Sequence, residues 1–163
     1  MNGKIFNCSQ LAPILEDKKR HGAVIVFTNG CFDLIHVGHI SYLRQCKQHG
    51  DILVVGLNTD YSVQLNKGPL RPIVPLVERA EILAALEMVD YVVPFDEETP
   101  YTLITTLRPN ILIKGADYTL DTIVGRNEVE SWGGIVKTIE LVQGKATRNI
   151  IQTIIERYCA NDR

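Results

Sequence analysis

The sequence has no long apolar run, no closely spaced cysteine pair and no excess of one charge. Its longest apolar stretches, such as residues 23–27 and 52–55, are far shorter than the roughly 18 residues that a membrane helix needs. No apolar segment follows a basic start at the N-terminus, so we expect no secretory signal and a cytoplasmic location. The formal net charge of −2 gives no general attraction to polyanions, so we expect neither nucleic acid nor a membrane as partner.

Cysteine is scarce and widely spaced, which argues against a disulfide framework. The four cysteines are Cys8, Cys31, Cys46 and Cys159, and no two of them form a CxxC pair. In a chain with no export signal, we expect reduced thiols and no structural zinc site.

The composition is that of an ordinary globular protein. Of the 163 residues, 45% are hydrophobic and 22% are charged, and there is no repeat, low-complexity segment or linker. This length is close to the usual size of one domain. We therefore expect a single domain over residues 1–163, in which residues 1–20 form a leading helix or extension.

Short apolar runs alternate with longer segments of helical periodicity. The runs predict five strands, at residues 23–27, 52–57, 91–93, 111–113 and 135–139. The other segments predict helices at residues 9–20, 37–48, 75–88, 127–132 and 147–158, with one more that begins with Thr99 as N-cap and Pro100 at its first position. This alternation predicts a doubly wound α/β fold with a parallel sheet, in which ligands bind beyond the carboxyl ends of the strands.

The segment after the first predicted strand combines histidine, glycine and a helix start. His36 and His39 are three residues apart, so both imidazoles can lie on one face of the helix. The helix N-terminus offers free N–H groups, and Gly30 and Gly38 leave room for a ligand near the backbone. Together these features predict a phosphate site with two histidine donors.

Three other interpretations of this segment compete with a phosphate site. One histidine can cap the helix while the other is a core or surface residue. A zinc site of Cys31, His36 and His39 would match no common ligand spacing and would lack an evident fourth ligand. A dinucleotide site would need the pattern GxGxxG, which the segment does not contain.

The segment from Thr28 to His39 resembles the HxGH signature of the nucleotidyltransferase superfamily, and the resemblance continues along the chain. Five further stretches follow in order, at residues 55–60, 67–72, 84–90, 95–100 and 113–118. The whole series, from about residue 22 to 158, is similar to the D-glycero-β-D-manno-heptose 1-phosphate adenylyltransferase family. The HxGH signature alone indicates only the superfamily, and the segments around Arg71 and Lys114 are what point to this family within it.

This resemblance implies a five-stranded, Rossmann-like nucleotidyltransferase fold, and an enzyme that transfers AMP from ATP to a sugar 1-phosphate and releases pyrophosphate. Mg²⁺ would accompany ATP without protein side chains as ligands, and a homodimer or homotetramer is expected. His36 and His39 would be catalytic. The expected nucleotide-binding residues are Asn29, Gly30, Cys31, Phe32, Gly38, Asn58, Lys114, Gly115, Lys145, Thr147 and Arg148. The expected substrate-binding residues are Asp33, Lys67, Arg71 and Asp117.

Several of these residues have a plainer interpretation. Lys67 and Arg71 lie in a predicted loop that contains Gly and Pro, where both side chains can simply be solvated. Asn58 can cap a turn, and we favour a role for Asp33 in orienting a backbone loop. On the helix predicted at residues 75–88, Glu78 and Arg79 are expected on a solvated face, although Arg79 can reach a phosphate.

The sequence departs from the superfamily pattern where the last helix begins. Ala146 and Arg148 stand where hydroxyl side chains are common, and only Thr147 remains. We expect Lys145 and Arg148 to hold the β- and γ-phosphates instead. The alternatives are a glycerol-3-phosphate cytidylyltransferase, or a relative acting on another phosphorylated alcohol, and a nucleotide-binding domain without turnover.

Overall fold

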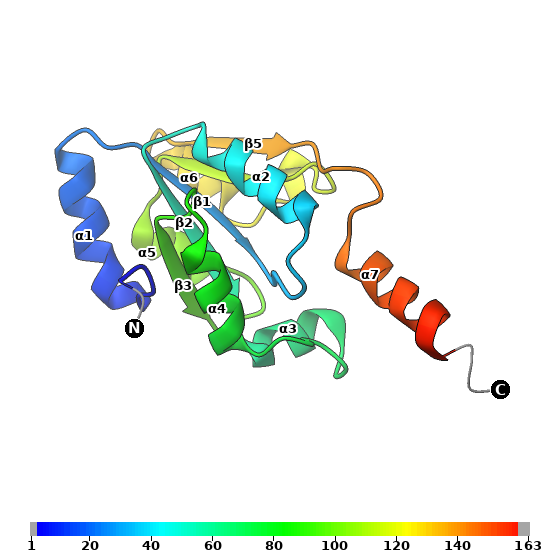
Figure 1. The fold of residues 1–163 in the computed structure, drawn as a ribbon. Helices are drawn as coiled ribbons and strands as arrows, with labels where there is room; N and C mark the ends of the chain where they lie inside the picture. The colour runs from blue at the N-terminus through cyan, green and yellow to red at the C-terminus, as the bar shows by residue number, and fades with distance from the viewer. Residues whose placement is uncertain (1–2, 160–163) are drawn as a thin grey trace.

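A parallel sheet with the strand order β3-β2-β1-β4-β5 forms the centre of the computed structural model, which describes residues 3–159 (Figure 1). Every neighbouring pair of strands is parallel. The strands are β1 (Ile25–Gly30), β2 (Ile52–Asn58), β3 (Tyr91–Phe95), β4 (Ile111–Gly115) and β5 (Ile135–Ile139). The predicted doubly wound α/β fold is confirmed.

Helices cover both faces of this sheet. They are α1 (Cys8–Arg20), α2 (Val37–Lys47), α3 (Asp60–Lys67), α4 (Leu76–Ala85), α5 (Tyr101–Leu107), α6 (Arg126–Ser131) and α7 (Thr147–Ile154), with a 3₁₀ turn η1 (Leu120–Thr122) and a π-helical turn η2 (Ile155–Cys159). Helices α2 and α4 pack on one face of the sheet, and α1, α5 and α6 pack on the other. None of these helices combines the length and apolar character that a membrane span requires.

Strand β1 shows why the sequence forms a sheet that is buried on both faces. Val26 joins the core cluster beneath α2 and α4, whereas Ile25 and Phe27 join the cluster beneath α1 and α5. Side chains alternate between the two faces of a strand, so an uninterrupted apolar run fills both cores.

The helices of the structure differ from the predicted ones at several places. Residues 60–67, for which no helix was predicted, form α3, and the side chain of Thr59 accepts a hydrogen bond from the amide of Ser62. Helix α4 ends at Ala85, three residues earlier than predicted. Helix α5 begins one residue later than predicted, because Pro100 and not Thr99 occupies the N-cap position. The last α-helix ends at Ile154, and its continuation over residues 155–159 is π-helical.

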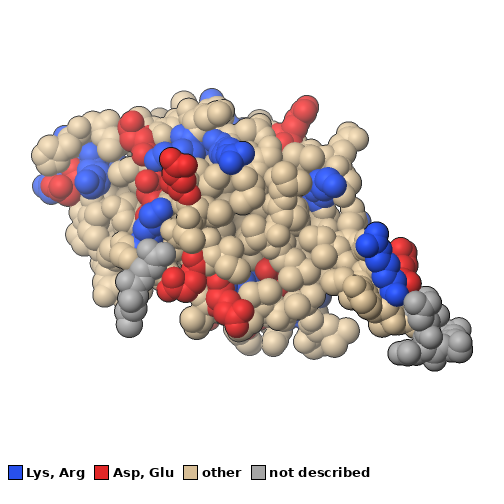
Figure 2. Space-filling model, in the orientation of Figure 1, with Lys and Arg blue, Asp and Glu red and all other residues tan. Residues whose placement is uncertain are grey.

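Helix α7 projects away from the rest of the molecule after β5 (Figure 1). Its first turn nevertheless contacts the loop before α2, because the hydroxyl of Thr147 donates to the carbonyl oxygen of Leu34 over 3.4 Å. On the face drawn in Figure 2, basic and acidic side chains are intermixed, and neither sign forms a continuous patch.

The fold predicts a clear contrast between two leucines in a stability measurement. Leu53 is fully buried in β2, whereas Leu70 is 89% exposed. We expect Leu53→Ala to lower the free energy of unfolding by about 2–5 kcal/mol, because it leaves a cavity in the core. The control Leu70→Ala should change it by less than about 0.5 kcal/mol. Urea denaturation measures both values, and equal effects would contradict the described core.

Candidate active site

The loops after β1 and β4 lie where the strand order reverses. From β1 the chain continues outward to β2 and β3, and it then returns to place β4 on the other side of β1. Strand β1 pairs with β2 on one side and with β4 on the other. The ammonium of Lys114, at the end of β4, donates to the side-chain oxygen of Asn29 over 3.0 Å. Burial lowers the pKa of Lys114 to about 8, against the opposing effect of Asp117. Such a reversal point is where open α/β sheets bind ligands.

His36 and His39 lie together at the N-terminus of α2. Their rings are stacked, with centroids 3.8 Å apart. His36 is the N-cap, and its Nδ1 accepts a hydrogen bond from the amide of Gly38 over 3.1 Å. An Nδ1 that accepts this bond carries no proton, so the proton of neutral His36 is on Nε2, which remains available as a donor. The capping role and a ligand-binding role are therefore compatible.

His39 is more deeply placed than His36. Its Nδ1 is buried and has no hydrogen-bond partner among the described residues. Burial, assisted by His36, lowers the pKa of His39 to about 4. Burial also lowers the pKa of His36, with a further contribution from the positive charge of Lys145. Both imidazoles are thus neutral near pH 7, and they act as hydrogen-bonding groups rather than as cations.

Gly38 is required by the close approach of the His36 ring. A Cβ atom at this position would lie 2.9 Å from Nδ1 and Cε1 of His36, and 3.1 Å from Cβ of Lys145. Phe32 has a left-handed backbone, with φ of 44°, and its ring packs near His39 with centroids 5.3 Å apart. Gly30 leaves room for that ring, which a Cβ atom would approach to 3.1 Å.

The start of α7 closes one side of the site. A cavity of about 200 Å³ is lined by His36 and by α7-side residues that include Lys145, Ala146 and Asn149. Ala146 is the N-cap of α7 and gives no side-chain cap, so the first amides of the helix have no side-chain acceptor. Arg148 is exposed and does not line this cavity. The structure thus brings Lys145 to the histidines but not Arg148.

Two further cations lie near the loop after β1. Lys67 ends α3, and the Nε of Arg71 donates to Asp33 over 2.5 Å, which leaves the Nη groups of Arg71 without a protein partner among the described residues. Both positive charges lie near Cys31, where they oppose the rise in its thiol pKa that burial causes. Lys67 also lowers the pKa of Lys114, so these cations surround one region.

Several predicted site residues are engaged within the protein. The carboxylate of Asp33 is buried and accepts from the amides of Ile73 and Val74, which is the loop-orienting role that we favoured. Asn58 is buried, and its side-chain amide donates to the hydroxyl of Ser62 in α3 over 2.9 Å. Direct ligand contacts of Asp33 and Asn58 remain predictions.

Asp117 and Gly115 lie at the end of β4. Asp117 is exposed, and a Cβ atom on Gly115 would fall 2.5 Å from its Oδ1. Gly115 therefore leaves the space that the Asp117 carboxylate occupies beside Lys114.

The expected solvated face for Arg79 is wrong. Arg79 is fully buried, and its guanidinium donates to three backbone carbonyl groups and to Asp60. The sequence carried a signal for this burial, because Arg79 precedes the buried Leu83 by four residues on one helix face.

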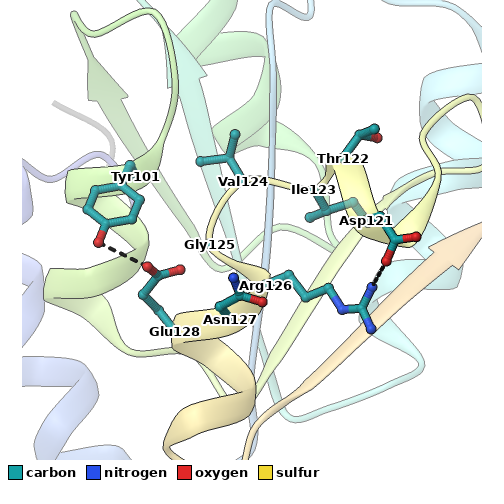
Figure 3. Close-up of a pocket in the computed structure, with 9 residues that line it drawn as sticks. All are labelled: Tyr101, Asp121, Thr122, Ile123, Val124, Gly125, Arg126, Asn127 and Glu128. Carbon is teal, nitrogen blue, oxygen red and sulfur yellow. Dashed lines mark hydrogen bonds and ion pairs between the residues drawn. The ribbon is translucent and has the colours of Figure 1, made fainter.

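A larger cavity, of about 490 Å³, lies away from the histidines and contains none of the predicted site residues (Figure 3). Tyr101 and Glu128 are hydrogen-bonded to one another at its edge, and Arg126 is paired with Asp121. Its polar side chains thus largely satisfy one another.

Within residues 3–159, no group of three or more His, Cys, Asp or Glu side chains could hold a metal ion. The side chains that surround the site are instead histidine and cationic. This donor set suits an anionic ligand and does not form a metal cage.

A comparison with models of known protein families shows to which family the chain belongs. Residues 27–161 match the cytidylyltransferase-like family model. The chain belongs to this family. The matched residues include His36 and His39, the cations Lys67, Arg71 and Lys114, and α7. The match confirms the predicted resemblance to nucleotidyltransferases.

Curated relatives of this cytidylyltransferase-like chain are named bifunctional protein HldE. The relative from Syntrophotalea carbinolica is 55% identical over 96% of the chain, and that from Geobacter sulfurreducens is 53% identical over 96%. In both cases the chain spans only 32% of the relative's length.

Two solved structures share the fold. A lipopolysaccharide core biosynthesis protein from Thermoplasma volcanium has a TM-score of 0.62 and 29% identity, and the match covers 76% of this chain and all of that one. The pantoate–β-alanine ligase from Francisella tularensis has a TM-score of 0.64 at 19% identity, over 94% of this chain and 75% of that one. The second likeness shows the fold alone.

The low pKa of His39 predicts a pH dependence of stability. His39 stays neutral in the folded chain down to about pH 4, whereas in the unfolded chain it is protonated below about pH 6.5. The unfolded state therefore binds the extra proton, and the free energy of unfolding falls as pH drops from 6.5 to 4, by at most about 1.4 kcal/mol per pH unit from this group.

Denaturation of the wild type and His39→Gln across this pH range measures the effect, and the variant should show the shallower slope. His21→Gln, at an exposed histidine, is the matched control and should keep the wild-type slope. Identical slopes for wild type and His39→Gln would contradict the neutral, buried His39.

Proposed function

We propose that the chain transfers AMP from ATP to the phosphate of D-glycero-β-D-manno-heptose 1-phosphate, forming ADP-heptose and pyrophosphate. The chain resembles the heptose 1-phosphate adenylyltransferase family in sequence, and relatives named bifunctional protein HldE are 53–55% identical over 96% of it. The structural relative from Thermoplasma volcanium is named a lipopolysaccharide core biosynthesis protein.

The observation that carries this proposal is the pair of neutral, stacked histidines at the N-terminus of α2, with the cation Lys145 near His36. His36 offers its Nε2–H, and the buried Nδ1 of His39 has no hydrogen-bond partner within residues 3–159. Preorganised donors of this kind stabilise the charge that develops on a phosphoryl group in the transition state. Lys114 and Lys145 add positive charge beside them.

The acceptor needs no general base. A sugar phosphate has a second pKa of about 6, so its oxygen is already ionised near neutral pH. The histidines agree with this, because burial lowers the pKa values of both His36 and His39. The chain's task is to align an acceptor oxygen with the α-phosphorus of ATP and to neutralise charge.

Two groups of residues in the site carry out different parts of this task. The uncapped start of α7 and Lys145 face the side on which pyrophosphate would leave. Lys67 and the free Nη groups of Arg71 suit the phosphate of the acceptor, because a guanidinium matches phosphate oxygens. Mg²⁺ enters with ATP as the Mg·ATP substrate, held by phosphate oxygens and water. A cytoplasmic location and a homo-oligomer are part of the same proposal.

A pyrophosphate-release assay tests the proposed reaction. ATP, CTP, GTP and UTP are each offered with heptose 1-phosphate, glycerol 3-phosphate and a panel of other sugar phosphates. We expect turnover with ATP and heptose 1-phosphate, and its loss when EDTA removes Mg²⁺. Higher turnover with CTP and glycerol 3-phosphate would replace our assignment with the cytidylyltransferase.

Two variants connect that turnover to the described site. His36→Ala and His39→Ala should each lower kcat by about 10²-fold or more, the usual cost of losing a transition-state donor. Circular dichroism checks that both variants remain folded. Wild-type kcat in folded variants would overturn the catalytic role of the histidines, and an inactive wild type with every substrate pair would favour a binding domain.

Lys145 and Arg148 should differ in their effect on ATP. Lys145 lines the cavity beside His36, whereas Arg148 is exposed outside it. We expect Lys145→Ala to raise the KM for ATP about tenfold, with a smaller change in the KM for the acceptor. Arg148→Ala, the matched control for charge, should change the KM for ATP less than threefold. Steady-state kinetics measures both, and the reverse order would contradict the geometry of α7.

A further inference from the structure

Arg79 is the largest fully buried side chain among residues 3–159, and its guanidinium is hydrogen-bonded to protein groups. Its Nε donates to the carbonyl of Val74 over 2.9 Å, and its Nη1 donates to the carbonyls of Cys31 and Asn58 over 2.7 and 2.8 Å. Its Nη2 is paired with Asp60 at 2.7 Å. One guanidinium therefore joins the loop after β1, the end of β2 with the start of α3, and the segment before α4.

Burying a guanidinium is an energetically unfavourable way to fill a hydrophobic core. Removing a cation from water costs several kcal/mol, and apolar side chains of similar volume often stabilise a protein more than a buried ion pair. Among residues 3–159, the only acidic partner of Arg79 is Asp60, whose side chain is 43% exposed. The three carbonyl groups, which belong to separate segments of the chain, accept the remaining hydrogen bonds. Such a residue fixes the relative positions of loops rather than maximising stability.

Asp33 holds the same segment from the other side. It is buried, and it accepts hydrogen bonds from the amides of Ile73 and Val74 and from the Nε of Arg71. Val74 is thus held twice, through its N–H by Asp33 and through its C=O by Arg79. Two opposite buried charges hold the segment 71–74 against the loop that leads to the histidines.

The segment that they hold carries a cation of the candidate acceptor site. Arg71 belongs to it, and Lys67 lies a few residues earlier at the end of α3. The start of α3 is itself tied to Arg79 through Asp60. The positions of both cations relative to the histidines therefore depend on Arg79.

We propose that Arg79 is a positioning residue for the acceptor: together with Asp33 it fixes Lys67 and Arg71 where they bind the acceptor's phosphate. This inference rests on the proposed function. It assigns to Arg79 an effect that passes through the two cations and not through direct contact with a ligand.

The test is a mutant cycle in which the cations are removed. Arg79→Lys keeps the charge but cannot reach all four acceptors, so we expect the KM for heptose 1-phosphate to rise about tenfold and the KM for ATP to change less than threefold. In the double variant Lys67→Ala/Arg71→Ala, adding Arg79→Lys should raise the acceptor KM by less than twofold more. Arg44→Lys, on the exposed face of α2, is the control and should behave as wild type.

The cycle separates a positioning role from a merely structural one. A residue that only stabilises the fold would affect both KM values alike, and its effect would be the same with and without Lys67 and Arg71. Either of those results would overturn the proposal. If Arg79→Lys does not fold, Asp60→Asn loosens the same clamp at its exposed end. It should raise the acceptor KM about threefold, and an unchanged value would overturn the proposal.

Failure of the proposed function gives a different result. A wild type that transfers no AMP to any acceptor contradicts the proposed function, and the positioning role is then measured by calorimetric titration with inorganic phosphate. We expect the Kd for phosphate to rise about tenfold in Arg79→Lys and to stay unchanged in Arg44→Lys. Equal Kd values in wild type and Arg79→Lys would overturn the inference without any assay of turnover.

Discussion

The geometry of the site depends on two hydrogen bonds to the backbone of Val74. Its N–H donates to the buried carboxylate of Asp33, and its C=O accepts from the buried guanidinium of Arg79. Through these two bonds the loop after β1, which leads to His36, is fixed against the segment that carries Arg71. The apolar core stabilises neither charge, so each must be satisfied by polar groups. The partners of Asp33 lie within residues 71–74, and those of Arg79 lie in three separate segments. The cost of burying these charges is offset only when those loops adopt one arrangement, which links the local conformation of the site to folding.

The electrostatics of the site follow from burial and from the cations around it. Burial, assisted by the charge of Lys145, lowers the pKa of His36, and deeper burial lowers the pKa of His39 to about 4. Neutral imidazoles are hydrogen-bond donors and poor general acids, while Lys67, Arg71 and Lys114 supply charge. This division suits a reaction in which the nucleophile is already ionised and the protein must position two phosphates and stabilise a charged transition state.

The fold could be predicted well from the sequence, because five apolar runs and the helical periods between them depend on local patterns. The shared face of His36 and His39 could be predicted from their spacing, whereas the stacking of the two rings could not. Gly38 was expected to leave room for a ligand, but the structure places the ring of His36 in that space. Helix α3 was missed because its eight residues show no clear apolar period. The burial of Arg79 was missed although its spacing to Leu83 indicated a buried helix face. Two of its carbonyl acceptors, Cys31 and Asn58, are 48 and 21 residues away in sequence, and no local pattern records such contacts.

The central claim is that ATP binds at the histidine loop and α7 and not in the larger cavity near Tyr101. A heteronuclear NMR titration of the folded chain with Mg²⁺ and a non-hydrolysable ATP analogue tests it most directly. The account predicts that backbone signals of residues 29–39, 114–117 and 144–149 shift together, with the imidazole signals of His36 and His39. Shifts confined to Tyr101 and residues 121–128 would contradict it.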